Sequence, residues 1–258
     1  MKISHLFQLA GMFLIPLFMV LIPLFLGKYY GIYSIKKSPT ILNAPIGTAV
    51  GAAFGLLAFM LAFTFQIVAN RYDSRKELLL EEVTNIRTTY LRAGLIPEPF
   101  RSDTKKLITE YVDLRLEVAD DYSKLDHMIS RSQQILDTFW DYTEQLAEQD
   151  RSSEVYALYI TSVNDLVDNY NQRVSMTLEY RIPVAIIVVL FIIEVLSMFA
   201  LGYNFGISGK GTYSINLILA IVFAVVMFLI LALDRPETGL VKLNTKPLIT
   251  LQNQLRSM

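Results

Sequence analysis

Long apolar runs dominate both ends of the chain. Four runs cover residues 6–26, 45–69, 183–205 and 214–233, and Glu194 is the only charged residue within them. A helix needs about 20 mostly apolar residues to cross the hydrocarbon core of a bilayer, and it satisfies its own backbone hydrogen bonds there. The runs are continuous rather than alternating, which excludes membrane strands. The pattern therefore predicts four transmembrane helices.

The first run follows Lys2, as the apolar part of a signal peptide would. It is longer than the apolar part of a typical signal peptide, and Gly27-Lys28-Tyr29 follow it instead of a small-x-small cleavage site. We therefore interpret the first run as an uncleaved span.

Between the second and third runs, residues 70–182 place apolar side chains every three or four positions. This spacing is typical of amphipathic helices with one buried face. Turn residues at 94–99, 123–126 and 150–153 divide the block into four helical stretches. The repeating positions include Leu79, Val83, Ile86 and Tyr90, then Leu107, Tyr111 and Leu114, then Ile129, Leu136 and Phe139, then Val155, Tyr159, Val163 and Leu166.

The second run continues into the first soluble helix without a break. Ile46 to Ala93 is therefore predicted as one helix of 48 residues, which at 1.5 Å per residue is about 70 Å long. The last soluble helix is expected to run into the third span, with a kink at Pro183.

The predicted fold class is an all-α membrane protein with four transmembrane helices continuous with a cytosolic helical bundle. The expected divisions are residues 1–69 with the first two spans, 70–182 as the cytosolic helical domain, 183–233 with the last two spans, and 234–258 as a cytosolic C-terminal segment.

Basic residues at the span ends predict the orientation. Lys and Arg are more frequent on the side of the termini than in the two short loops opposite, so the termini and residues 70–182 are expected in the cytoplasm of a multi-pass protein of the inner membrane. The terminal side carries Lys2, Arg71, Arg75, Lys76, Arg173, Arg181, Arg235, Lys242 and Lys246, and the opposite loops carry Lys28, Lys36, Lys37 and Lys210.

The net charge of −1 conceals a separation of charge along the chain. Residues 70–182 hold 14 Lys and Arg against 21 Asp and Glu, a net charge of −7. This balance, with 53% hydrophobic residues overall, excludes a disordered chain and an electrostatic nucleic-acid binder. The absence of cysteine excludes disulfide scaffolds, thiol enzymes and Cys-type metal sites.

The sequence contains few of the residue patterns that are typical of enzyme active sites. His5 and His127 are the only histidines, so His-based triads and metal clusters lack parts. The carboxylates of residues 70–182 are spread along helix faces and fit no calcium-loop pattern, which favours a solvated face. We expect neither enzymatic activity nor a cofactor.

Three small residues follow each other at a spacing of four in the second span: Gly47, Gly51 and Gly55. Such a face allows two helices to approach closely. It serves helix packing alone, or it also lets the second span pack around an axis or bend during gating.

Glu194 lies near the middle of the third span. A carboxylate there costs about 2.5–3.5 kcal/mol on insertion scales, so it is a functional candidate by default. It either faces an ion or proton pathway, or it is a structural hydrogen-bond partner of groups such as Thr64 or Gln66.

Charged residues gather where the second and fourth spans end. They can pair across helices and couple the soluble block to the spans, or they can serve as interfacial anchors worth up to about 1 kcal/mol each. The residues are Arg71, Asp73, Arg75, Asp234 and Arg235.

The second span and its continuation resemble those of bestrophins. The carrying residues are the apolar run from Gly55 to Gln66, the following Asn70-Arg-Tyr-Asp73, the Asn85-Ile-Arg87 series and the Pro-containing segment from Leu233 to Gly239. With Glu81-Glu82, Tyr90-Leu-Arg92 and Pro97-Glu-Pro99, the chain is identified as a member of the uncharacterised bacterial family called bestrophin-like.

The resemblance implies a symmetric oligomer with the second span around a central ion pathway. Bestrophins are pentameric channels, and a pentamer or a tetramer is expected here. Phe59, Phe63, Gln66 and Ile67 then become candidates for a hydrophobic constriction, which can gate by dewetting. Without the resemblance, the favoured interpretation of these residues is lipid-facing or core side chains.

Two functions remain open from the sequence. The first is an oligomeric ion channel whose cytosolic helices form an acidic vestibule, with membrane lipid and permeant ions as partners and no nucleic acid. The alternative is a non-conducting membrane sensor or assembly protein whose cytosolic bundle binds a partner.

Overall fold

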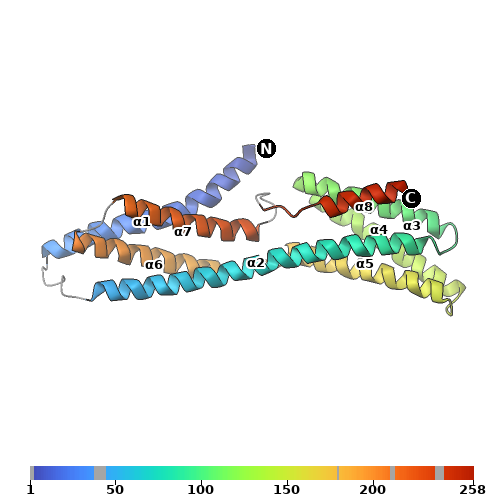
Figure 1. The fold of residues 1–258 in the computed structure, drawn as a ribbon, viewed down its shortest axis with the longest axis horizontal. Coiled ribbons are helices and arrows are strands. Elements are labelled where there is room, and N and C mark those ends of the chain that lie inside the picture. The colour runs from blue at the N-terminus through green and yellow to red at the C-terminus, as the bar shows by residue number, and fades with distance from the viewer. Residues whose placement is uncertain (1–2, 38–44, 179, 210–212, 236–240) are drawn as a thin grey trace. The chain divides into compact units, whose positions relative to one another are not determined.

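The computed structural model describes residues 3–37, 45–178, 180–209, 213–235 and 241–258. Every regular element among them is helical, as the sequence predicts. The long helices are α1 (Ile3–Lys37), α2 (Ile46–Ala93), α3 (Phe100–Asp120), α4 (Leu125–Gln149), α5 (Glu154–Leu178), α6 (Val184–Ser208) and α7 (Tyr213–Asp234), followed by the shorter α8 (Lys246–Ser257) (Figure 1).

The chain divides into two compact units. The first, which we call the membrane unit, comprises residues 1–72 and 181–241, and the second, the helical unit, comprises residues 73–180 and 242–258. Among the described residues, four helices are long and apolar enough to cross a membrane: α1, α2, α6 and α7. The helix of 48 residues predicted from Ile46 to Ala93 is confirmed as α2.

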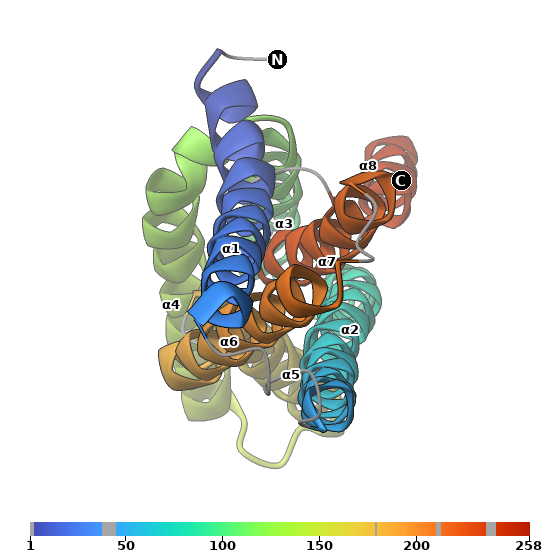
Figure 2. The same ribbon diagram turned by 90° about the vertical axis from the view of Figure 1, so that its left-hand side faces the viewer.

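In the membrane unit, α1 packs against both α6 and α7 (Figures 1 and 2). An apolar core joins these helices to the first half of α2. Its fully buried members include Val20 of α1, Leu57 and Val68 of α2, Met198 of α6, and Ala220 and Met227 of α7.

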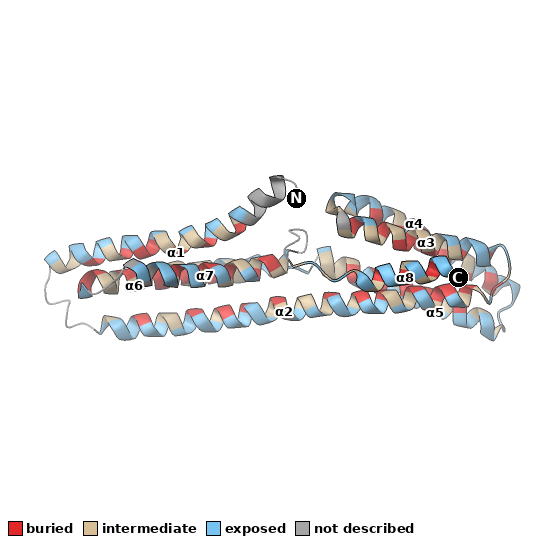
Figure 3. Cartoon of the chain, turned by 45° about the horizontal axis from the view of Figure 1, so that its top comes forward, coloured by how far each residue is buried: buried red, intermediate tan, exposed pale blue. Residues whose placement is uncertain are grey.

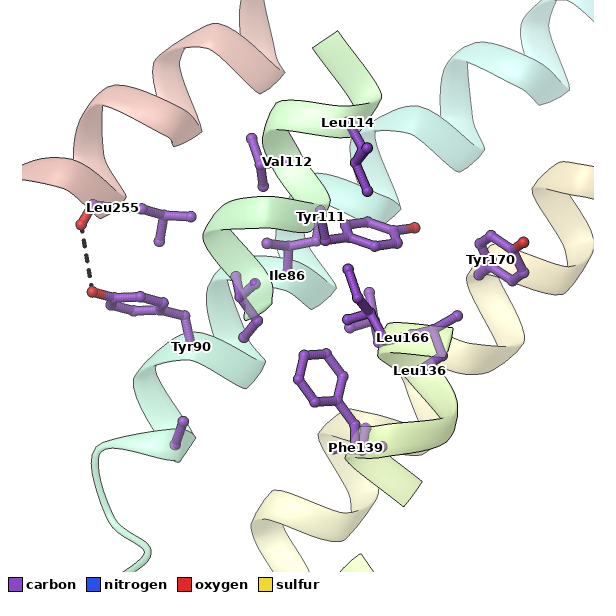
Figure 4. Packing of buried hydrophobic residues seen from close by; sticks show 14 of the residues in the cluster. Ile86, Tyr90, Tyr111, Val112, Leu114, Leu136, Phe139, Leu166, Tyr170 and Leu255 are labelled. Atoms are coloured by element: carbon purple, nitrogen blue, oxygen red, sulfur yellow. Dashed lines mark hydrogen bonds between the residues drawn. The ribbon is translucent and has the colours of Figure 1, made fainter. Parts of the chain in front are cut away.

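The helical unit has its own core between α2, α3, α4, α5 and α8. Tyr111, Leu136, Phe139 and Leu166 point toward one another at its centre, and the hydroxyl of Tyr90 donates to the backbone oxygen of Leu255 at 3.4 Å (Figure 4). The buried positions follow the three-and-four spacing of the sequence, which is why each helix presents one apolar face.

Two local expectations were wrong. The segment 27–37 was expected in a loop, but α1 continues through it because Gly27 and Gly31 pack against α6. The kink expected at Pro183 is a full interruption: α5 ends at Leu178, α6 begins at Val184, and residues 180–182 are not helical. A proline disfavours the helical conformation of the residue before it and lacks the N–H that would continue the ladder.

Candidate functional site

The first half of α2 has one buried side and one exposed side. Leu57, Leu61 and Val68 are buried against the membrane-unit core. On the opposite side of the helix, the side chain of Phe59 is 65% exposed and that of Phe63 is 53% exposed. Buried and exposed residues alternate in this way along α2 in Figure 3.

Of the four residues proposed for a constriction, Gln66 shares the exposed side of α2 with Phe59 and Phe63. Ile67 is half-buried at its margin. The rings of Phe59 and Phe63 are stacked, with centroids 6.4 Å apart and an interplanar angle of 14°. One turn further, the Gln66 side-chain amide donates to Asn70 Oδ1 at 2.6 Å, so two aromatic rings are followed by a linked pair of amides.

The glycines of the second span have no packing partner among the residues that the structure describes. A Cβ built on Gly47, Gly51 or Gly55 meets no atom within 4 Å among the described residues. The predicted role of these glycines in helix packing therefore remains a prediction, and it concerns contacts with another copy.

The exposed surfaces of α6 and α7 are of a different kind. Apart from Phe199, the large side chains exposed on α6 and α7 are bulky aliphatics, as expected for contact with lipid tails. They include Val188, Val189, Ile192 and Leu196 on α6, and Leu217, Ile218, Ile221, Val222 and Val225 on α7. The exposed side of α2, with its glycines, stacked rings and amides, is unlike these surfaces.

Glu194 is completely buried within the membrane unit. Neither of its carboxyl oxygens has a hydrogen-bond partner among the described residues. The expected bonds to Thr64 and Gln66 are not made: the Thr64 hydroxyl donates to the backbone oxygen of Met60 at 2.8 Å, and Gln66 turns toward Asn70. A buried carboxyl without a partner is energetically costly, so Glu194 remains a candidate for a functional role.

Asp234 joins three parts of the membrane unit. Its Oδ1 accepts from Arg71 Nη1 of α2 at 3.4 Å and from the backbone N–H of Ile182, just before α6, at 3.0 Å. The Asp234 side chain is only 7% exposed, so this pair is more than an exposed surface contact. Arg235 lies beside it and is exposed, whereas Asp73 and Arg75 belong to the helical unit, where Asp73 is exposed and Arg75 is buried.

A close crossing of α1 and α6 was not foreseen from the sequence. A Cβ on Gly27 would collide with the backbone oxygen of Phe199, and one on Gly202 would collide with that of Leu24. Gly31 and Gly206 make the same kind of contact one turn away. The spacing of four on both helices was the available signal for this contact.

A buried ionic cluster in the helical unit was also missed. Glu82 of α2 is fully buried and contacts Tyr111 and Arg115 of α3 and Arg173 of α5. Burial by itself would raise the pKa of the Glu82 carboxyl, but the two guanidinium charges and the hydrogen bonds outweigh it and hold this pKa below its ordinary value. The cluster therefore keeps Glu82 ionised and fixes α2 to α3 and α5.

Within the described ranges, no three His, Asp or Glu side chains come close enough together to hold a metal ion. The exposed side of α2 between residues 46 and 70 is an uncharged helix face, suited to packing or to lining a passage.

Comparison with known proteins gives a consistent result. A family model described as the Bestrophin-like domain matches residues 19–248. A crystal structure of a mutant bacterial bestrophin homologue from Klebsiella pneumoniae has 15% sequence identity and a TM-score of 0.69, covering 93% of this chain and 97% of that chain. A second mutant of that homologue has 16% identity and a TM-score of 0.67 over the same shares of the two chains.

A further crystal structure, described only as a membrane protein, has 15% identity and a TM-score of 0.65, covering 96% of this chain and 95% of that chain. No curated protein matches the chain. At these identities the solved structures show a shared fold.

Proposed function

The chain belongs to the bestrophin-like family, and on that premise we propose that it is a subunit of an oligomeric ion channel whose α2 helices line a central pathway. The observation that carries the proposal is the exposed side of α2. It combines glycines without neighbours, two stacked aromatic rings and two amides in a helix that is apolar enough to span a membrane.

The composition of this side favours a pathway over lipid. An amide in the hydrocarbon region is costly unless it meets protein or water. Gln66 and Asn70 satisfy one hydrogen bond with each other and leave further donors and acceptors for water or a passing ion. Phe59 and Phe63, repeated in each copy, would form a narrow apolar ring that gates by dewetting.

The glycines explain how several α2 helices can share one axis. Gly47, Gly51 and Gly55 allow the backbone of a neighbouring helix to approach closely. The aliphatic sides of α6 and α7 then face membrane lipid. We propose a homo-oligomer, with a pentamer or a tetramer as the expected number of subunits.

The charge of residues 70–182 bears on the choice of ion. With the termini in the cytoplasm of an inner-membrane protein, this block of net charge −7 forms an acidic vestibule. Such a vestibule concentrates cations near the pathway at low ionic strength, which favours cation flux over anion flux.

The absence of native cysteine allows a sharp test. Cysteine is introduced singly at Phe59, Phe63 or Gln66, and a charged thiol reagent is added to purified protein in liposomes under imposed K⁺, Na⁺ or Cl⁻ gradients. We expect the reagent to block flux at these positions. The matched control is Val222→Cys, exposed on the aliphatic side of α7, where the reagent should leave flux unchanged.

The sign of the reversal potential then decides between anions and cations. Flux that is equally insensitive to the reagent at all four positions would overturn the assignment of the pathway to α2. Absence of flux across pH values and calcium concentrations would favour a non-conducting sensor or assembly protein, and a pull-down with the full-length chain would follow.

A further inference from the structure

A groove runs between α2 and α8 within the helical unit. Its lining includes Thr84, Arg87 and Leu91 of α2 and Lys246 and Thr250 of α8. Both charged residues in the lining are basic, and no acidic residue lines the groove in the described part of the chain. A basic groove in a strongly acidic block is complementary to an acidic occupant.

The exposed edge of α5 has the opposite charge. Glu154, Asp165 and Asp168 are exposed, and Arg173, the only basic residue of α5, is buried against Glu82. Within the described ranges, neither Asp165 nor Asp168 forms an ion pair. The α5 edge therefore presents uncompensated negative charge.

Three acids of α3 are less suitable partners, because they are already paired within the chain. Glu110 pairs with Arg131, Asp113 with Arg256 and Glu117 with Lys124. These three acids therefore offer less uncompensated negative charge than Asp165 and Asp168 of α5.

The groove and the α5 edge lie on opposite sides of α2. The Asn85 side-chain amide donates to the backbone oxygen of Asp165, and Arg92 donates to that of Leu158, so these α2 positions face α5. Arg87 faces the groove beside α8. Residues 85 and 87 are two positions apart, which is about 200° around an α-helix.

Apolar side chains accompany the charges on both sides. Leu91 in the groove is 51% exposed, and on the α5 edge Leu158 is 47% and Val155 40% exposed. An apolar centre with a charged rim is the usual composition of a specific protein interface.

We propose that the α5 edge of one copy of this chain docks in the α2/α8 groove of the next copy, with Arg87 and Lys246 meeting the acidic residues of that neighbouring α5. Because the two surfaces differ and lie on opposite sides of α2, the contact is head-to-tail and repeats around a closed ring. The inference rests on the oligomer that the proposed channel requires, and it names the surfaces that assemble it.

Cross-linking in the cysteine-free background tests the contact directly. Thr250→Cys places a thiol in the groove and Thr161→Cys places one on the exposed α5 edge. The double variant, treated with a short bismaleimide in detergent, is expected to give a ladder of bands that ends at the number of subunits. Each single variant should remain monomeric on the gel, because like surfaces do not meet. A dimer from either single variant, or no ladder from the double variant, would overturn the proposal.

Charge reversal gives an independent result. Reversal of the groove (Arg87→Glu with Lys246→Glu) or of the edge (Asp165→Lys with Asp168→Lys) should raise the concentration at which the oligomer dissociates by at least about tenfold. Combining all four substitutions should restore assembly. Dissociation that the combination does not reverse would contradict the pairing.

Ion flux, measured on the same preparations, separates this inference from the proposed function. A ladder without flux supports the interface and counts against the channel. Flux without a ladder supports the channel and overturns this interface.

Discussion

Glu82 and Arg115 form a bidentate ion pair in the core of the helical unit. Arg115 Nε lies 2.9 Å from Glu82 Oε1, and Nη2 lies 3.2 Å from Oε2. Arg173 Nε lies 3.2 Å from Oε1, and the Tyr111 hydroxyl donates to the same oxygen at 3.0 Å. One carboxylate from α2 thus holds groups from α3 and α5, in a protein whose candidate function resides on α2.

Glu82→Gln should destabilise the helical unit by about 3–5 kcal/mol, because it leaves the buried guanidinium of Arg173 and the partly buried one of Arg115 without a counter-charge. Trp140 of α4 is the only tryptophan, so urea unfolding followed by its fluorescence reports on the helical unit. Glu81→Gln, at the adjacent exposed position, is the matched control and should change stability by no more than about 0.5 kcal/mol. Equal losses in the two variants would contradict a special role for Glu82.

The Glu82 carboxylate should also make the stability of the helical unit depend on pH. Since folding lowers the pKa of Glu82, its contribution is fully present above the ordinary value of 4.5 and is lost as the pH falls through the folded pKa. The stability difference between the native chain and Glu82→Gln should therefore be constant near neutrality and shrink progressively below that value. Urea midpoints measured at a series of pH values test this, and a difference that persists unchanged to low pH would disprove it.

Gly202→Ala should reduce the thermal stability of the membrane unit, because its Cβ would collide with the backbone of α1 at Leu24. Overpacking of this kind costs about 1–3 kcal/mol. Gly11→Ala on α1 has no atom within 4 Å of its new Cβ and should be neutral or slightly stabilising. Retention of monodisperse protein after heating in detergent compares the two. Equal tolerance of both substitutions would show that the crossing is looser than described.

Gly51→Leu should affect the oligomer and not the fold of the single subunit. None of the described residues has an atom within 4 Å of a Cβ at this position, so each subunit should keep its fold. The oligomer should weaken, because the bulky side chain separates neighbouring α2 helices. Light scattering in detergent gives the oligomer mass and circular dichroism gives the helix content. Intact assembly with Leu at this position would place Gly51 against lipid instead.

Two substitutions of Glu194 distinguish a structural role of this residue from a functional one. Glu194→Leu removes a buried carboxyl without a partner and should leave stability unchanged or raise it. Glu194→Gln keeps the shape but cannot exchange a proton. If Glu194 acts in a pathway, this variant should alter the pH response of ion flux in liposomes. Unchanged flux and pH response would rule out the pathway role.

The sequence predicts the long elements well because their signals are local. Ile46 to Ala93 contains no proline, and its three glycines lie in the apolar half, where a helix tolerates them. The C-terminal helix α8 was missed, although Pro247 near its first turn and Leu248, Leu251 and Leu255 mark its start and its buried side. It was overlooked because it is short and lies among polar residues.

The candidate site was only partly predictable. Exposure of Phe59, Phe63 and Gln66 follows from helix periodicity once the buried side is known. The environment of Glu82 does not follow from helix periodicity. In the sequence, Glu81 and Glu82 are adjacent and equivalent acids, and only the fold brings Arg115 and Arg173 to Glu82. Likewise, composition marks Glu194 as costly, but it cannot show that both carboxyl oxygens lack a partner.

The glycine contacts between α1 and α6 bear on how the spans can move. Where backbone touches backbone, no side chain is present to change rotamer and absorb a displacement, so these two helices shift together or not at all. The α1 and α6 helices therefore act as one rigid unit when other spans move. A transition between closed and open states would be carried by α2, whose far side has no such contacts, and by the link from Arg71 to Asp234 that ties α2 to the fixed frame.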